Sequence, residues 1–223
     1  MSRKSVTGAS ALMVATMLVT ALAVGTSLPT DAQLPIHWGL DGEPDGFSDK
    51  WTALLLPAGI TFALSLFFFF LPAIEPRRDG LERSQGLYLW GWVTILLMGA
   101  VIQLAVVAVA LGWPVDADRL IVAGTGVMLV LIGNQLGKSR SMYFIGMRTP
   151  WTLASEDVWI RTHRLAGKLM VAAGLVTAGA ALIDLPSGWR VALFVAVIAL
   201  SAGIPIVYSF LLWRRERLAQ PSE

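Results

Sequence analysis

Six long apolar stretches, separated by polar segments, dominate the pattern of the chain. They cover approximately residues 8–28, 51–72, 87–113, 120–137, 165–185 and 190–213. A helix needs roughly 20 apolar residues to cross the hydrocarbon core of a bilayer, and each stretch is close to or above that length. The pattern therefore predicts an all-α fold class, a polytopic integral membrane helical bundle of six transmembrane helices in the cell's inner (plasma) membrane.

The first apolar stretch follows Arg3 and Lys4, and a signal peptide has the same order of charge and hydrophobicity. Its apolar run is longer than the roughly 7–15 residues of a signal sequence's hydrophobic region. This length favours a helix that is retained in the membrane. Cleavage next to the small residues 21–23 is the alternative.

The composition favours lipid contact and excludes several classes of protein. Of the 223 residues, 56% are hydrophobic and only 14% are charged, whereas soluble domains carry roughly 25% charged residues. The chain has no cysteine, which excludes disulfides, thiolate metal sites and cysteine nucleophiles. The net charge of +2 is too small to indicate direct nucleic acid binding.

Lysine and arginine are distributed unevenly between the two sides of the predicted bundle. One side would hold the termini, the segments after the second and fourth stretches and the start of the fifth, with fourteen of the seventeen basic residues. The other side holds only Lys50, Arg119 and Arg190. Because basic residues are retained in the cytoplasm, both termini are predicted to lie inside and residues 30–50 outside.

The outer segment, residues 30–50, is acidic and rich in proline and glycine, and it is predicted to be a turn-rich loop. Residues 41–46 resemble the opening of a calcium loop, but Thr52 stands where a bidentate glutamate is needed and Pro44 is out of place. We therefore predict a solvated acidic turn without a metal. The residues expected to meet a cationic or amphipathic ligand are His37, Trp38, Asp41, Glu43 and Asp45.

The inner segment, residues 134–167, is too long, too basic and too aromatic for a simple connector. Ser155 is a good N-cap, so a helix is predicted to start there and run into the fifth stretch, with Trp159 and His163 on one face. Arg148 is predicted to turn back toward the two acids that follow this cap, or to bind lipid phosphate. The segment is either a positively charged anchor or a binding site, and composition does not separate the two.

The predicted spans contain no set of groups suited to catalysis or ion coupling. No Asp, Glu, Lys, Arg or His occurs in the middle of any stretch, so the ionisable relay of a coupled transporter is missing. His37 and His163 lie on opposite predicted sides, and neither HExxH nor GxSxG occurs. We predict no enzyme activity, no cofactor and no metal. Gln103, Asn134 and Gln135 are expected to be buried, forming hydrogen bonds between helices rather than a substrate site.

Several motifs resemble one family of bacterial membrane proteins. The motifs Gly133-Asn134, Gly137-Lys138, Gly146-Met147-Arg148-Thr149-Pro150-Trp151-Thr152-Leu153, Val158-Trp159, Thr162-His163-Arg164 and Gly167 resemble the signature of the SdpI-type immunity proteins. Those proteins are receptors for a secreted peptide toxin. The outer motifs Leu34-Pro35-Ile36-His37-Trp38, Gly42-Glu43-Pro44-Asp45 and Lys50 resemble the small module often fused to their N-terminus. Ser141-Met142 departs from the Pro-Asn that the family often has there.

The resemblance implies two domains, an N-terminal module at residues 1–72 with two helices and the acidic outer loop, and a four-helix SdpI-like domain at residues 73–223. It also implies protection against a peptide toxin and capture of a cytoplasmic repressor protein once the toxin is bound. The expected partners are therefore membrane lipid, the secreted peptide toxin and a cytoplasmic repressor protein. The inner residues assigned to ligand or partner binding are Asn134, Lys138, Arg148, Thr149, Pro150, Trp151, Trp159, Thr162, His163 and Arg164.

Five of these inner residues are expected to form one site beside the start of the fifth stretch: Arg148, Trp151, Trp159, His163 and Arg164. The leading hypothesis is a multi-pass membrane immunity protein or receptor whose outer side detects or neutralises a secreted antimicrobial peptide, while residues 138–164 either report inward or hold the bundle together. The alternative is a transporter or permease for a peptide or a small amphiphile.

Overall fold

The computed structural model describes residues 1–39 and 42–219. Six of its helices are long and apolar enough to cross a membrane. They are α1 (Arg3–Ser27), α2 (Lys50–Ile74), α4 (Gln85–Ala110), α5 (Ala117–Leu136), α7 (Glu156–Leu182) and α8 (Ser187–Ala219). The connections contain two short helices, α3 (Arg78–Glu82) and α6 (Pro150–Ala154), and two strands, β1 (Gln33–Trp38) and β2 (Pro44–Asp49). The prediction of a helical membrane protein with six spans is confirmed.

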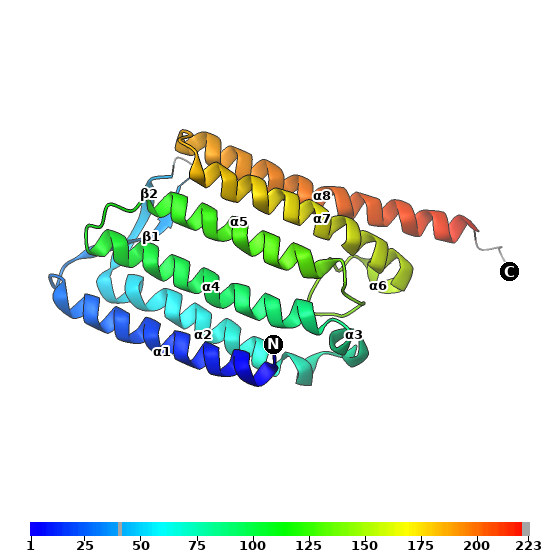
Figure 1. Ribbon diagram of the computed structural model, residues 1–223, viewed down its shortest axis with the longest axis horizontal. Helices are drawn as coiled ribbons and strands as arrows, with labels where there is room; N and C mark the ends of the chain where they lie inside the picture. Colours follow the sequence, from blue (N-terminus) through cyan, green and yellow to red (C-terminus); the bar gives the residue numbers. More distant parts are fainter. Residues whose placement is uncertain (40–41, 220–223) are drawn as a thin grey trace.

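The long helices lie side by side, and their packing follows a simple order (Figure 1). Helices α1, α2 and α4 pack together at one edge, α5 packs between α4 and α7, and α8 covers α7 at the other edge. The two strands lie at one end of the bundle, which we call the hairpin end. The start of α1, the end of α8, and helices α3 and α6 lie at the opposite end, called the α3/α6 end below, which the basic residues predict to be cytoplasmic.

The helices extend beyond the apolar stretches because polar residues cap them. Ser2 accepts a hydrogen bond from the Ser5 N–H (3.2 Å), so α1 begins at Arg3. As predicted, Ser155 caps α7, which then runs without a break into the fifth span. Helix α8 continues beyond the sixth apolar stretch to Ala219, and basic residues in its last turns complement the helix dipole.

The prediction of a turn-rich loop at residues 30–50 is wrong, because most of this segment forms an antiparallel hairpin. Leu34 pairs with Ser48, and the register shifts on either side of His37. A two-stranded sheet alone is marginal in water, but β1 packs on α2 and α4. Buried Leu34 joins the same core cluster as Leu54 of α2. Packing on the helices therefore stabilises strands in a segment whose composition indicates a loop.

Two glycine pairs let α5 and α7 approach closely, because small residues allow the backbones of two helices to touch. Gly126 faces Gly174, where a Cβ would lie 2.5 Å from the Gly126 carbonyl oxygen. Gly133 faces Gly167, where a Cβ would lie 2.6 Å from the Gly133 carbonyl oxygen. Gly124 lies against α4 instead. Backbone-to-backbone contact at both pairs fixes α7 against α5 along most of the bundle.

Candidate functional sites at the two ends of the bundle

Two polar side chains fasten the hairpin to the helices. Buried Lys50 donates from Nζ to the Leu28 carbonyl oxygen at the end of α1 (2.8 Å). Asp49 caps α2 by accepting hydrogen bonds from the Trp51 and Thr52 N–H groups (3.0 and 3.1 Å). Hydrogen bonds from the side chain and backbone of Thr52 hold the pKa of the Asp49 carboxyl below its ordinary value. The hairpin therefore has a defined position at the ends of α1 and α2.

The predicted outer residues divide into a surface pair and two residues that line a cavity. His37 and Asp45 face each other across the hairpin, with 2.5 Å between His37 Nδ1 and Asp45 Oδ1, and both side chains are exposed. Trp38 and Glu43 line a cavity beside α5 and α8. Asp41 lies outside the described residues. Of the four predicted residues that the structure describes, Trp38 and Glu43 are thus the ones placed to meet a molecule that enters that cavity.

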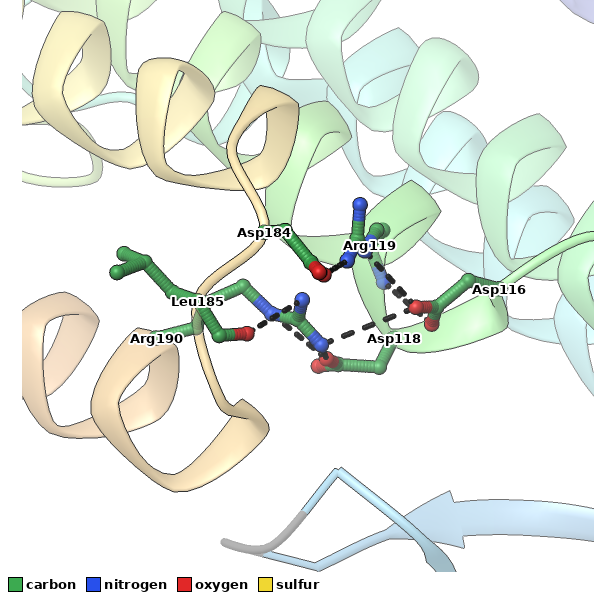
Figure 2. A network of polar contacts seen from close by, with 6 residues as sticks. All are labelled: Asp116, Asp118, Arg119, Asp184, Leu185 and Arg190. Carbon is green, nitrogen blue, oxygen red and sulfur yellow. Dashed lines mark hydrogen bonds and ion pairs between the residues drawn. The ribbon is translucent and has the colours of Figure 1, made fainter.

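A charged network joins α5 to α8 at the hairpin end (Figure 2). Asp118 and Arg190 form its buried core, with side chains 9% and 5% exposed, and Asp118 Oδ2 accepts from Arg190 Nη2 (2.5 Å) and Nε (3.1 Å). Arg119 contacts Asp116 (3.0 Å from Nε to Oδ2) and pairs with exposed Asp184. The network ties together the start of α5, the turn after α7 and the start of α8 (Figure 2).

Sequence reasoning missed this network as a unit. The available signal was that Arg119 and Arg190 are two of only three basic residues on the predicted outer side, where basic residues are otherwise avoided. A cation kept on the unfavoured side needs a reason, and a carboxylate partner is the commonest one.

Two cavities meet at Trp38. The charged basin, about 370 Å³, is lined by the hairpin and the network, including Glu43 and Arg190. The apolar groove, about 360 Å³, is lined by side chains of α2, α4 and β1, including Ile60 and Ile102. Trp38 belongs to both linings. A charged basin and an apolar groove that share a wall suit a molecule with one polar and one apolar face.

At the α3/α6 end, Trp159 and His163 form a stacked and fully buried pair, with ring centroids 3.9 Å apart. His163 Nε2 accepts from the Met147 N–H (2.8 Å), and Nδ1 lies 2.8 Å from the Trp159 carbonyl oxygen. Because a carbonyl oxygen only accepts, Nδ1 carries the proton and the ring is neutral. Gly146 has a φ of +116°, and a Cβ there would lie 2.7 Å from His163 Nε2. The pair therefore holds the loop between α5 and α6 in place.

The other predicted inner residues do not gather around this pair. Trp151 packs on α8 against Phe210, with 5.3 Å between ring centroids, and its indole N–H donates to Ser209 Oγ. Thr149 caps α6 in a capping box with Thr152, and Pro150 is the first residue of the helix. Thr162 is buried, whereas Asn134, Lys138 and Arg164 are exposed. The predicted inner residues thus comprise a buried structural group and a separate exposed group.

Arg148 belongs to the exposed group, and its predicted contact with the two acids after Ser155 is wrong. Its Nη1 donates instead to the Tyr143 carbonyl oxygen (2.6 Å), and the predicted alternative, binding of lipid phosphate, stays a prediction. The two acids after Ser155 have other partners: Asp157 pairs with Arg161 (2.8 Å), and the preceding glutamate lies 3.9 Å from an arginine in the loop after α5.

A buried carboxylate that sequence reasoning missed organises the same end. Glu75, 2% exposed at the end of α2, accepts hydrogen bonds from the N–H groups of Arg77 (3.0 Å), Tyr143 (2.9 and 3.1 Å) and Phe144 (3.0 Å). Arg77 in turn donates to Ser141 Oγ and to a carbonyl oxygen of α6 (2.9 Å). These bonds attach the loop between α5 and α6 to the end of α2. The available signal was an acid at the end of an apolar span, where burial is costly without partners.

The polar residues expected inside the bundle give a mixed result. Gln103 is buried and donates from Nε2 to the Leu54 carbonyl oxygen (3.1 Å), so its predicted interhelical hydrogen bond is confirmed. Asn134 is exposed, so its predicted burial is wrong: it lies about 100° around α5 from Gly133, outside the close contact with α7. Gln135 is half-buried. Among the described residues, no group of three or more His, Cys, Asp or Glu side chains could hold a metal ion.

Comparison with known proteins assigns most of the chain to recognised segments. The model of the SdpI/YfhL protein family matches residues 138–209, and that of a domain of unknown function, DUF1648, matches residues 11–62. The immunity protein SdpI of Bacillus subtilis (strain 168) is 26% identical over 169 residues, which are 76% of this chain and 78% of that protein. No solved structure gives a significant match.

Proposed function

The chain is an SdpI/YfhL family membrane protein with an N-terminal DUF1648 domain, and we propose that it is an immunity protein that protects the cell against a secreted antimicrobial peptide. The Bacillus subtilis relative, named an immunity protein, supports the class of function. A toxin that acts on the membrane arrives from outside, so the proposed site of capture is the hairpin end. We also propose that the chain has two domains, with the boundary between residues 72 and 73.

The observation that carries the proposal is the position of Trp38 between the charged basin and the apolar groove. Peptides that lie on membranes are commonly basic on one face and apolar on the other. The predicted outer side carries eight acidic residues against three basic ones, so it attracts a basic face. The apolar face would enter the groove beside Trp38, with the indole ring contacting both faces of the peptide.

The test is survival of a sensitive host that expresses the protein and is challenged with peptides from its own producer strain. Trp38→Ala removes a wall of both cavities, and we expect the tolerated peptide concentration to fall roughly tenfold or more, as for the central aromatic residue of an interface. Phe47→Ala is the matched control, because Phe47 is an aromatic residue of the same hairpin, 58% exposed, that lines neither cavity. If Trp38→Ala protects like the parent at equal membrane abundance, the proposed capture site is wrong.

The proposal extends to a cytoplasmic repressor protein as an inner partner. The exposed basic members of the predicted inner group, Lys138, Arg148 and Arg164, form the surface it would contact. Substituting them together with glutamine should abolish toxin-dependent recruitment of the repressor to membranes while leaving survival unchanged. Vesicle assays separate the alternative function: uptake or efflux of peptide driven by a proton gradient would favour a transporter and contradict capture.

A further inference from the structure

Four arginines converge on a second polar pocket, of about 380 Å³, at the α3/α6 end. They come from three segments: the connection between α2 and α3, helix α3 with the residue after it, and the loop between α5 and α6. They are Arg77, Arg78, Arg83 and Arg140. Two carboxylates, Asp79 and Glu156, also line the pocket, so the lining carries an excess of positive charge.

Backbone contacts hold the pocket in shape. A Cβ on Gly80 would lie 2.0 Å from the Ser141 carbonyl oxygen, so α3 touches the loop backbone directly. The Arg140 N–H donates to Ser84 Oγ (2.8 Å), and its Nη1 donates to the carbonyl oxygens of Lys138 (3.3 Å) and the next residue (3.2 Å). Arg77 is held by the hydrogen bond that it donates to Ser141 Oγ. The walls are therefore positioned before any ligand arrives.

The guanidinium groups retain donors that no protein group uses. Arg140 Nε is buried, and within the described structure it forms no hydrogen bond; the nearest carboxylate oxygen, on Glu156, is 3.9 Å away. Arg78 and Arg83 are exposed and form no ion pair with any described residue. Several guanidinium groups that face one space from different directions suit a tetrahedral anion, which offers oxygen atoms on all sides.

We propose that this pocket binds a phosphate group, and that a glycerophospholipid headgroup of the adjacent leaflet supplies it. Ile74, 47% exposed, ends the apolar surface of α2 just before the first lining residue, Pro76, so a lipid beside α2 would bring its phosphate to the rim. Asp79 and Glu156 would accept hydrogen bonds from hydroxyl or ammonium groups of the headgroup. Helix α3, which lines the pocket, lies at the opposite end of the bundle from the hairpin and the proposed toxin site (Figure 1), so the proposal does not rest on toxin binding.

The test measures lipid retention by the purified full chain in dodecyl maltoside, using native mass spectrometry. The probes are dioleoylphosphatidylglycerol, dioleoylglycerol, which has the same chains without phosphate, and free glycerol 3-phosphate. The test variant combines Arg78→Gln with Arg83→Gln. The matched control combines Arg214→Gln with Arg215→Gln on the exposed end of α8, which removes the same charge elsewhere at the basic end.

We expect the phosphatidylglycerol to bind and dioleoylglycerol not to bind. The test variant should lose roughly tenfold in affinity for each arginine removed, whereas the α8 control should stay within about twofold of the parent. Equal loss in both variants would mean that bulk positive charge attracts the lipid, and equal binding of dioleoylglycerol would mean that phosphate is not recognised; either result overturns the proposal. Displacement of the lipid by glycerol 3-phosphate would support a pocket that also takes free phosphate esters, and binding of the lipid alone would support the membrane as the source.

Discussion

The buried Glu75 carboxylate offers the sharpest test of how the α3/α6 end is held together. Glu75→Gln keeps the size of the side chain and one acceptor oxygen, but it replaces the other oxygen with an NH₂ group. The Tyr143 N–H lies near both oxygens, so the NH₂ group would face it in either orientation, together with the N–H of Arg77 or of Phe144, instead of accepting from them. The substitution therefore removes charge from every remaining bond and leaves at least one buried N–H group unpaired.

The size of the effect follows from the bonds counted in the structure. A hydrogen bond to a charged group contributes about 1.5–3 kcal/mol, and an unpaired buried donor costs about 1–3 kcal/mol. Glu75 receives three N–H donors, of which the amide can satisfy only part. We expect the free energy of local opening of the loop to fall by about 3 kcal/mol, which raises the equilibrium constant for opening roughly a hundredfold.

Hydrogen exchange with mass spectrometry measures this opening directly. In Glu75→Gln, the amides of Tyr143 and Phe144 should exchange roughly a hundredfold faster than in the parent. The Met147 amide should change less, because His163 holds it separately. Glu82→Gln is the matched control, since it removes a negative charge from an exposed side chain of nearby α3. Unchanged exchange at residues 143 and 144 in Glu75→Gln would refute the reasoning.

Three further predictions concern the hairpin end and the orientation of the chain. Asp118→Asn should lower the unfolding free energy by about 3 kcal/mol, because it removes the carboxylate that buried Arg190 contacts most closely and leaves Asp116, at 3.8 Å, as the next carboxylate. Asp184→Asn on the exposed edge of the same network should change little. Thermal unfolding in detergent measures both, and equal effects would contradict the buried core. Because the pKa of Asp49 is lowered in the folded protein, its cap stabilises α2 fully above the ordinary value of 3.8 and is lost as the pH falls below that value. Tryptophan fluorescence should report a transition below pH 3.8 that Asp49→Asn abolishes. A cysteine at Asp45 should react with impermeant reagent in intact cells and one at Ser155 only after permeabilisation, and labelling of position 155 in intact cells would reverse the predicted topology.

Much of the fold could be predicted because it depends on local properties of the chain. The membrane is the solvent for a span, so roughly 20 consecutive apolar residues determine a helix whatever its neighbours are. The Ser155 cap acts within its own first turn, and it placed the start of α7 correctly. The glycines of the fourth stretch indicated close helix contact from their small size alone, although the partner helix of each could not be named.

The candidate sites depend on contacts that the sequence does not encode locally. Glu75 and Tyr143 are 68 residues apart, and Asp118 and Arg190 are 72 residues apart, so only the packed bundle brings each charge to its partner. The bundle also buried Trp159 and His163 against the loop and turned Arg148 away from them, which separated residues that spacing had grouped.

The hairpin shows the same division between local and tertiary control. Its proline and glycine content indicates turns, but buried apolar contacts with α2 and α4 stabilise two strands there. What the sequence by itself determined was which segments enter the membrane, since water and lipid sort residues by hydrophobicity one segment at a time. The tertiary structure decided which polar groups meet, because a buried charge or hydrogen-bonding group is stable only beside a partner that another segment supplies.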